Sequence, residues 1–202
     1  MAGLRLGILG GTLDPVHRGH LLLAGAARDE LGLERVLFVP AGQPWRKAAL
    51  PITSGEHRLA MLRLALEGES AFEIATLELE REGPSYAADT LEALRRDQPN
   101  HEHFFILGED ALVDLPNWVR PGRILELATL AVARRTGTDR KEVEEAARRL
   151  PGLLDRVAWL KMPLVEASAT EIRDRVRRGL PIGDLVPRVV EAYIREHGLY
   201  RA

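Results

Sequence analysis

Two histidines three residues apart, His17 and His20, close a glycine-rich segment near the start of the chain, Gly10–His20, which reads GGTLDPVHRGH. The segment follows an apolar run of strand type, and the residues after it have the spacing of a helix. Glycines at such a junction let backbone N–H groups approach a phosphate closely, and two imidazoles beside a helix start can donate to one phosphate chain. Gly19 removes a side chain that would crowd the two rings. The pattern predicts a site for nucleotide phosphates, and the alternative is an ordinary tight turn followed by two solvated histidines.

A second segment with phosphate-binding chemistry lies near the other end of the chain, at Ala167–Arg173. Ser168 followed three residues later by Glu171 is a capping-box pattern, which predicts the start of a helix. The free N–H groups of such a helix end attract anions, the hydroxyls of Ser168 and Thr170 can donate to phosphate oxygens, and Arg173 adds a fork-shaped cation. A capped helix without a ligand explains the segment equally well when it is taken alone. Together with the two histidines, the segment favours a second phosphate contact.

The elements that must position these residues follow from the hydrophobic pattern. Apolar runs of strand type alternate with amphipathic helical stretches, which is typical of a parallel sheet with helices on both faces. The expected strands are Leu4–Leu9, Arg35–Val39, His103–Leu107, Thr129–Ala133 and Arg156–Leu160. The expected helices are Gly19–Leu31, Gly55–Glu67, Tyr86–Arg96, Arg140–Leu150 and a final helix from Pro187 to Gly198. Ligands of open α/β sheets bind beyond the carboxyl ends of the strands, where this order places the glycine-rich segment.

Length, charge and composition restrict the domain organisation and the partners. With 202 residues the chain can bury one sizeable core, and we expect a single domain, 1–202, whose C-terminal part from about residue 165 is a helical appendage. The 28 basic and 30 acidic side chains give a net charge of −2, which excludes a global positive field for nucleic-acid binding. No apolar run reaches membrane-spanning length, so we expect a cytoplasmic protein without membrane contact. The absence of cysteine excludes disulfides and thiolate catalysis.

The Gly10–His20 segment resembles the GGTxDPxHxGH signature of the nucleotidyltransferase superfamily, in the form found in bacterial nicotinate-nucleotide adenylyltransferases. The Ala167–Arg173 segment is similar to the SxTx[IV]R motif of that family, with Ala169 where serine is frequent. The resemblance covers most of the chain and implies an α/β, Rossmann-like nucleotidyltransferase fold. It implies three catalytic residues, which are His17, His20 and Arg173. The residues that it implies for ATP binding are Gly10, Gly11, Thr12, Gly19, Gly108, Asp110, Ser168 and Thr170.

Further motifs of the family point to a second substrate, nicotinate mononucleotide. Gly83–Leu91 looks like the SYTxDTL segment, but Ala87 replaces the usual threonine, and Pro40–Lys47 matches a proline- and lysine-containing loop only in part. The resemblance implies that a tryptophan stacks on the pyridine ring, whereas plain core packing is the alternative for that side chain. The residues implied for this substrate are Lys47, Ser85, Tyr86, Trp118 and Arg134. A wall of N–H donors without an acidic group nearby should favour the nicotinate over the nicotinamide nucleotide.

The resemblance implies adenylyl transfer from ATP to nicotinate mononucleotide, giving deamido-NAD and pyrophosphate. The attacking group is already an ionised phosphate oxygen, so no side chain needs to act as a nucleophile. We expect Mg²⁺ held mainly by the ATP phosphates, no metal site built from protein residues, and room for a homo-oligomer. The alternative enzymes are a pantetheine-phosphate or a nicotinamide-nucleotide adenylyltransferase, and, less well matched, a class I aminoacyl-tRNA synthetase. The alternative outside catalysis is a nucleotide-binding sensor module.

Overall fold

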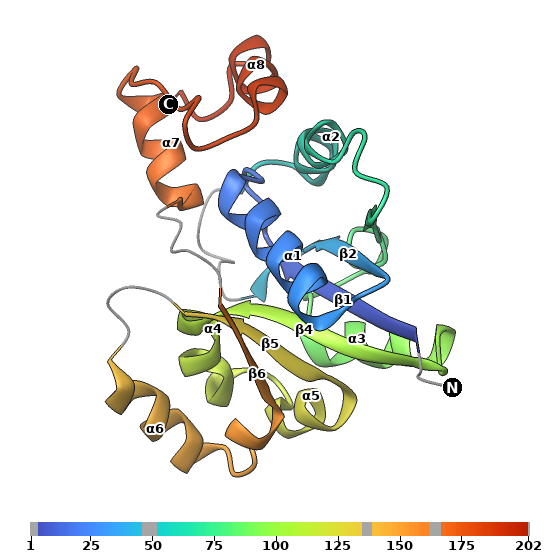
Figure 1. Ribbon diagram of the computed structural model, residues 1–202. Helices are drawn as coiled ribbons and strands as arrows, with labels where there is room; N and C mark the ends of the chain where they lie inside the picture. Colours follow the sequence, from blue (N-terminus) through green and yellow to red (C-terminus); the bar gives the residue numbers. More distant parts are fainter. Residues whose placement is uncertain (1–3, 46–51, 135–138, 162–166, 202) are drawn as a thin grey trace.

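A computed structural model describes residues 4–45, 52–134, 139–161 and 167–201 of the chain (Figure 1). These residues form one sheet of six parallel strands in the order β3-β2-β1-β4-β5-β6. The strands are β1 (Leu4–Gly11), β2 (Arg35–Pro40), β3 (Phe72–Ile74), β4 (His101–Gly108), β5 (Thr129–Ala133) and β6 (Val157–Leu160). The α-helices are α1 (Arg18–Leu31), α2 (Gly55–Ala65), α3 (Ala87–Asp97), α4 (Glu109–Asp114), α5 (Pro121–Leu127), α6 (Arg140–Arg149), α7 (Ala169–Arg177) and α8 (Arg188–Glu196). Two 3-10 turns are η2 (Leu115–Asn117) and η3 (Leu154–Arg156).

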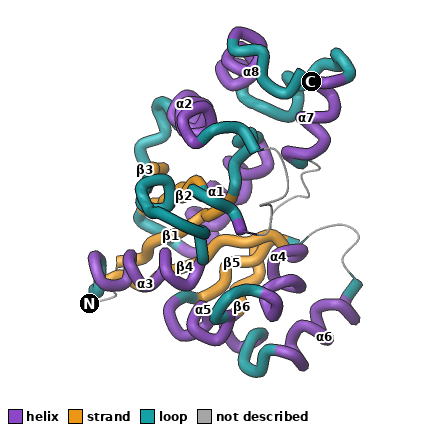
Figure 2. The backbone as a smooth tube through the Cα atoms, turned by 180° about the vertical axis from the view of Figure 1, so that it is seen from behind, coloured by secondary structure: helices purple, strands orange, loops and turns teal. Residues whose placement is uncertain are grey.

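Helices cover both faces of the sheet, which confirms the predicted fold class. On one face, residues of β1, β2 and β4 such as Phe38 and Ile106 form a core with residues of α1, α2, α7 and α8. On the other face, alternate residues of the same strands, such as Ile8 and Phe105, form a core with residues of α3, α4, α5 and α6. Figure 1 and the view from behind in Figure 2 both show α7 and α8 at the end of the molecule opposite α5 and α6. None of the helices in the described ranges is long and apolar enough to cross a membrane.

The strand order changes direction beside β1. This strand pairs with β2 on one side and with β4 on the other, so the chain adds strands first toward β3 and then toward β6. At such a switch point the loops that follow the two neighbouring strands diverge and leave a crevice at the carboxyl edge of the sheet. Here the chain after Gly11 forms a loop that leads to α1, and the chain after Gly108 continues directly into α4. The fold therefore places the glycine-rich segment at the position where doubly wound sheets bind nucleotides.

The five predicted strands and the predicted helices are confirmed, with ends that differ by at most two residues. The prediction missed the strand β3 and the helices α4 and α5. These elements have three, six and seven residues, which is too short to show a hydrophobic period. Ser54 and Asp139 are the N-caps of α2 and α6, and the side chain of each accepts a hydrogen bond from a backbone N–H group in the first turn.

Candidate active site

Two adjoining cavities open at the carboxyl edge of the sheet, and both are bordered by Gly10, Gly11, Thr12 and Trp118. The larger has a volume of about 450 Å³, and both histidines of the motif line it. The smaller has a volume of about 200 Å³ and is lined mainly by apolar and aromatic side chains. The end of β1 thus lies between a polar compartment and an apolar one.

The two histidines lie together at the start of α1. His17 is the N-cap residue, and its ring stacks on that of His20 with centroids 3.6 Å apart. The backbone N–H of His17 donates to Nδ1 of His20 over 3.2 Å. Because Nδ1 accepts this hydrogen bond, a neutral His20 carries its ring proton on Nε2. The arrangement turns His20 into an N–H donor on the wall of the larger cavity.

Gly19 is required by the close approach of the segments around it. A Cβ atom at this position would lie 3.0 Å from Nδ1 of His17 and 3.5 Å from the carbonyl oxygen of Ala167. The first distance is tighter than ordinary van der Waals contact, so a larger residue would displace the imidazole. The prediction that Gly19 makes room for the histidines is confirmed for the ring of His17.

The start of α7 borders the same cavity through Ala167, Ala169 and Arg173. Ser168 is the N-cap residue, and its hydroxyl accepts from the N–H of Glu171 over 3.1 Å. The predicted capping box is only half formed, because the Glu171 carboxylate pairs with Arg175 at 2.7 Å instead of turning back to the N-cap. The oxygen of the Ser168 hydroxyl therefore serves the helix start as an acceptor, and its hydrogen can still be donated to a ligand.

Arg173 uses both arms of its guanidinium to link α7 to the loop after β1. One arm donates to the carbonyl oxygen of Asp14 over 2.7 Å, and the other donates to Oγ1 of Thr170 over 3.3 Å. Thr170 accepts in this contact, so the hydrogen of its hydroxyl remains available to a ligand. Arg173 itself lines the larger cavity. The predicted roles of these residues toward phosphate stay predictions.

Other predicted residues lie on the opposite wall of the larger cavity, where β4 and β5 end. Gly108 is the N-cap residue of α4, and Asp110 lies in its first turn. Arg134 follows β5 and lies with its guanidinium 5.0 Å from the ring centroid of Trp159. The structure thus places Arg134 beside the larger cavity, whereas the sequence assigned it to the mononucleotide.

Trp118 forms part of the wall between the two cavities. Its Nε1–H donates to Asp114 over 2.9 Å, and its ring packs edge-on against Phe105 with centroids 6.2 Å apart. These contacts fix the orientation of the indole while leaving part of it toward the cavities. The core-packing interpretation and the ligand-stacking interpretation are therefore compatible.

The segment around Ser85 closes the smaller cavity. The hydroxyl of Ser85 accepts from the N–H of Gly42 over 2.9 Å. The backbone N–H of Ser85 donates to the carbonyl oxygen of Gln43 over 2.9 Å. Tyr86 is the N-cap residue of α3 and packs edge-on against Trp45, with ring centroids 5.8 Å apart. Ser85 thus ties two loops together. Lys47 lies outside the described residues.

Sequence reasoning missed a buried carboxylate in the wall of the smaller cavity. Glu78 is only 7% exposed, and its Oε1 accepts from the hydroxyl of Thr90 over 2.6 Å. The sequence predicted a wall of N–H donors without an acidic group nearby, and the presence of Glu78 shows that this prediction is wrong. Glu78 follows no motif and precedes α3 in a stretch without regular structure, so nothing local in the sequence marks it.

Comparison with known proteins agrees with this geometry. Residues 8–175 match the Cytidylyltransferase-like family. A probable nicotinate-nucleotide adenylyltransferase from Thermomicrobium roseum is 50% identical over 197 residues, which are 98% of this chain and 92% of the relative. A protein with the same description from Roseiflexus sp. is 43% identical over the whole of both chains.

Solved structures show the same fold at much lower identity. The nicotinic acid mononucleotide adenylyltransferase of Plasmodium falciparum, in its complex with NaAD, has a TM-score of 0.78 at 19% identity and covers 98% of this chain, with 97% of that chain matched. The match of sequence over nearly full length, together with the two cavities at the switch point, shows where the chain belongs. It is a member of the Cytidylyltransferase-like family and, within it, of the nicotinate-nucleotide adenylyltransferases.

Proposed function

We infer that this chain transfers the adenylyl group of ATP to nicotinate mononucleotide, giving deamido-NAD and pyrophosphate in NAD biosynthesis. The observation that carries this inference is the meeting of two unlike cavities at Gly10–Thr12 and Trp118. The polar one, lined by His17, His20 and Arg173, suits a triphosphate, and the apolar one suits a pyridine ring. A phosphate attached to the ring nucleotide would then face the α-phosphate of ATP across the end of β1.

The reaction needs positioning and charge stabilisation rather than a protein nucleophile. An oxygen of the mononucleotide phosphate attacks the α-phosphorus of ATP, a new P–O bond forms, and the bond to the bridging oxygen of the β-phosphate breaks. Pyrophosphate departs with the electron pair of that bond. We assign His17 and His20 to the α- and β-phosphates, and Arg173 with the start of α7 to the departing β- and γ-phosphates. Such donors lower the barrier because their dipoles already point to where charge develops.

Nucleotidyltransferases of this family use a divalent metal ion, and we propose Mg²⁺. In the part of the chain that the structure describes, no three acidic or histidine side chains come together in a way that could hold a metal. The donors that fit are phosphate oxygens and water, which Mg²⁺ prefers over protein cages. The ion would supply neutralisation of the phosphate charge, and the protein residues would orient the phosphates around it.

The start of α3 supports the preference for an acidic pyridine nucleotide. Ala87, the first residue of this helix, lines the smaller cavity, and the N-cap residue Tyr86 makes no side-chain cap hydrogen bond. The first N–H groups of a helix have no partner within it and favour an anion. A ring carboxylate could accept from them while the pyridine ring lies against Trp118. The Glu78 carboxylate would repel a ring carboxylate. The preference for the nicotinate nucleotide therefore depends on whether its ring carboxylate lies closer to the N–H groups of α3 or to Glu78.

The experiment is a pyrophosphate-release assay with ATP and each mononucleotide. We expect kcat/KM to favour the nicotinate over the nicotinamide nucleotide by roughly ten- to a hundredfold, the value of one charge-assisted hydrogen bond. The Trp118→Ala variant should raise KM for the mononucleotide with little change in KM for ATP. Equal use of both mononucleotides would refute the nicotinate assignment and leave adenylyl transfer standing. An unchanged KM for the mononucleotide in the Trp118→Ala variant would show that Trp118 serves core packing and does not bind this substrate.

Three further proposals accompany this function. We propose that the region from about residue 165 to the C-terminus, which contains α7 and α8, acts as a helical appendage to a single nucleotidyltransferase domain. We also propose that the enzyme acts in the cytoplasm and binds neither nucleic acid nor membranes. Association into a homo-oligomer stays a prediction, which sedimentation of the purified chain would test.

A further inference from the structure

Asp14, in the loop between β1 and α1, is held from three distant parts of the chain. Its carboxylate is buried, with Oδ1 accepting from the hydroxyl of Tyr200 over 2.7 Å and Oδ2 accepting from the N–H of Thr53 over 3.2 Å. Its main-chain carbonyl accepts from Arg173 over 2.7 Å. Asp14 also borders the larger cavity. One residue of the phosphate-binding loop thus joins the C-terminal end, the segment before α2, and α7.

A buried guanidinium reinforces the same connection. Arg58, on α2, is only 2% exposed, and it donates to the carbonyl oxygens of Thr12 and Thr53 over 2.9 Å each. Burial lowers the pKa of Arg58, while the nearby charge of Asp14 raises it. A buried cation persists when acceptors and an opposite charge compensate its lost hydration. The loop from Thr12 to Asp14 is therefore held at both ends by hydrogen bonds, which we call tethers: Arg58 binds Thr12, and Tyr200 binds Asp14.

The backbone adopts unusual conformations at both ends of the Tyr200 contact. Leu13 has a φ of +50° and Tyr200 a φ of +64°, values in the left-handed region that side chains with a Cβ rarely adopt. Such conformations persist only where the surroundings over-determine them, and they gather at functional sites. Here Leu13 lies between the two tethered residues, Thr12 and Asp14. The side chain of Leu13 is buried in the core, so core packing and the hydrogen bonds to its two neighbours together constrain this position.

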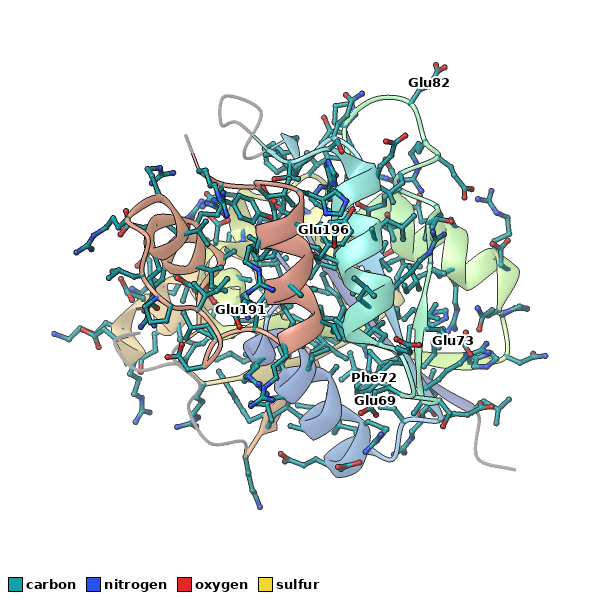
Figure 3. The ribbon with its side chains drawn as sticks, turned by 90° about the horizontal axis from the view of Figure 1, so that it is seen from above. Glu69, Phe72, Glu73, Glu82, Glu191 and Glu196 are labelled. Atoms are coloured by element: carbon teal, nitrogen blue, oxygen red, sulfur yellow. The ribbon has the colours of Figure 1, made fainter. Side chains whose placement is uncertain are left out.

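The helices that carry the tethers lie side by side. Figure 3 shows α8, which carries the labelled Glu191 and Glu196, next to α2. Arg58 belongs to α2, and Tyr200 follows α8 by four residues, so packing of the two helices aims both side chains at the same loop. Burial and the neighbouring Asp14 carboxylate both raise the pKa of Tyr200, which keeps its hydroxyl protonated as a donor.

We propose that Tyr200, Asp14 and Arg58 form a positioning network that holds the phosphate-binding loop and Arg173 in their reactive geometry. The C-terminal end of the chain is then part of the catalytic machinery although it touches no substrate. None of the three is a catalytic residue in this proposal, since each acts through Arg173 and the backbone of the loop. The expected effect of this network on turnover rests on the proposed adenylyl transfer. Its expected effect on the conformation of the loop does not depend on that function.

The test compares Tyr200→Phe with Tyr193→Phe, which is a matched control. Tyr193 is also partly buried near α2, its hydroxyl lies 2.9 Å from Nδ1 of His57, and it lines neither cavity. We expect Tyr200→Phe to lower kcat by about ten- to a hundredfold, because small displacements of positioned groups cost that much. KM for both substrates should change less than about threefold, since the ground-state contacts remain. Tyr193→Phe should shift the melting temperature similarly and leave kcat unchanged.

Two further readouts separate positioning from general stability. Hydrogen exchange of the amides in residues 13–20 should accelerate in Tyr200→Phe and not in Tyr193→Phe. In combination with Arg173→Lys, the loss of kcat from Tyr200→Phe should be smaller than in the parent enzyme, because both variants disturb one network. Equal kcat values for the two tyrosine variants, strictly multiplicative losses with Arg173→Lys, or unchanged exchange in the loop would each overturn the proposal. A parent enzyme that makes no deamido-NAD would instead refute the proposed function, and the exchange measurement would still test the network.

Discussion

At the scale of single residues, several side chains assigned to ligand binding also hold the site together. The hydroxyl of Ser85 anchors the backbone of Gly42, and the hydroxyl of Ser168 caps α7. Arg173 donates to the carbonyl oxygen of Asp14. Such residues pre-organise the site, so their substitution should affect stability and catalysis together. His20 contacts its neighbour His17 through a hydrogen bond from the His17 backbone and through ring stacking, and it lines the larger cavity.

His20→Ala should lower kcat by about 10²-fold or more and change the affinity for ATP much less. The reason is that its Nε2–H would meet charge on the bridging oxygen only as pyrophosphate leaves, and loss of one such donor costs roughly 10²–10³ in rate. Steady-state kinetics with ATP as the varied substrate measures both effects. His197→Ala is the control, since that histidine is exposed beyond α8 and lines neither cavity. A near-normal kcat for His20→Ala would show that His20 does not stabilise the charge on the departing pyrophosphate.

At the scale of elements, the wall of the smaller cavity depends on two loops that lie almost in contact. A Cβ atom at Gly42 would lie 2.0 Å from the carbonyl oxygen of Glu78, which is backbone and cannot rotate away. The bridge between Gln43 and Pro84 joins the same two loops. The shape of this cavity therefore rests on the absence of a side chain at Gly42.

Gly42→Ala should destabilise the protein by about 1–3 kcal/mol and raise KM for the mononucleotide, because the two loops must move apart. Gly25→Ala is the matched control. Gly25 lies inside α1, where an added Cβ meets nothing within 4 Å, and alanine there should stabilise by about 0.5–1 kcal/mol. Urea denaturation and the KM values of both variants measure these effects. If Gly42→Ala were as stable as the parent, the loops would not be in the contact described.

At the scale of the whole molecule, the pH dependence of stability involves a histidine buried within the sheet. His103 lies on β4, five residues before the strand ends at the active site, and it is buried with only 3% of its surface exposed. Neither ring nitrogen has a hydrogen-bond partner among the described residues. Burial, with smaller contributions from Arg95 and His101, lowers the pKa of His103 to about 4.

This histidine should make the fold sensitive to mild acid. Its pKa in the folded state lies below the unfolded value of about 6.5, so the unfolded chain binds more protons between pH 6.5 and 4. The contribution of His103 is fully present above pH 6.5 and is lost as the pH falls toward 4. Between pH 7.5 and 5 the loss should be about 2 kcal/mol. Urea denaturation at both pH values should show a correspondingly smaller loss in His103→Leu. Parallel losses in parent and variant would show that His103 is not the group responsible.

The sequence by itself determined the features that depend on near neighbours along the chain. Strands such as Thr129–Ala133 and helices such as α6 were predictable because five or more residues repeat one hydrophobic pattern. The glycine-rich turn after β1 was predictable because its glycines and histidines lie within eleven residues. The stacking of His17 on His20 follows from their spacing on one side of a helix start.

Only the tertiary structure decided which polar groups that are distant in the sequence meet in space. The contact between Tyr200 and Asp14 spans 186 positions, and that between Arg58 and Thr12 spans 46. No local pattern marks such partners, because their energy comes from burial created when α2, α8 and the loop after β1 pack together. No local pattern marks Glu78 either. Its placement in the wall of the smaller cavity depends on the loop around Gly42, which is hydrogen-bonded to Ser85. The short-range pattern therefore specified the residue types of the turn after β1, while long-range packing decided the shape of the second cavity and the contacts that hold the turn in place.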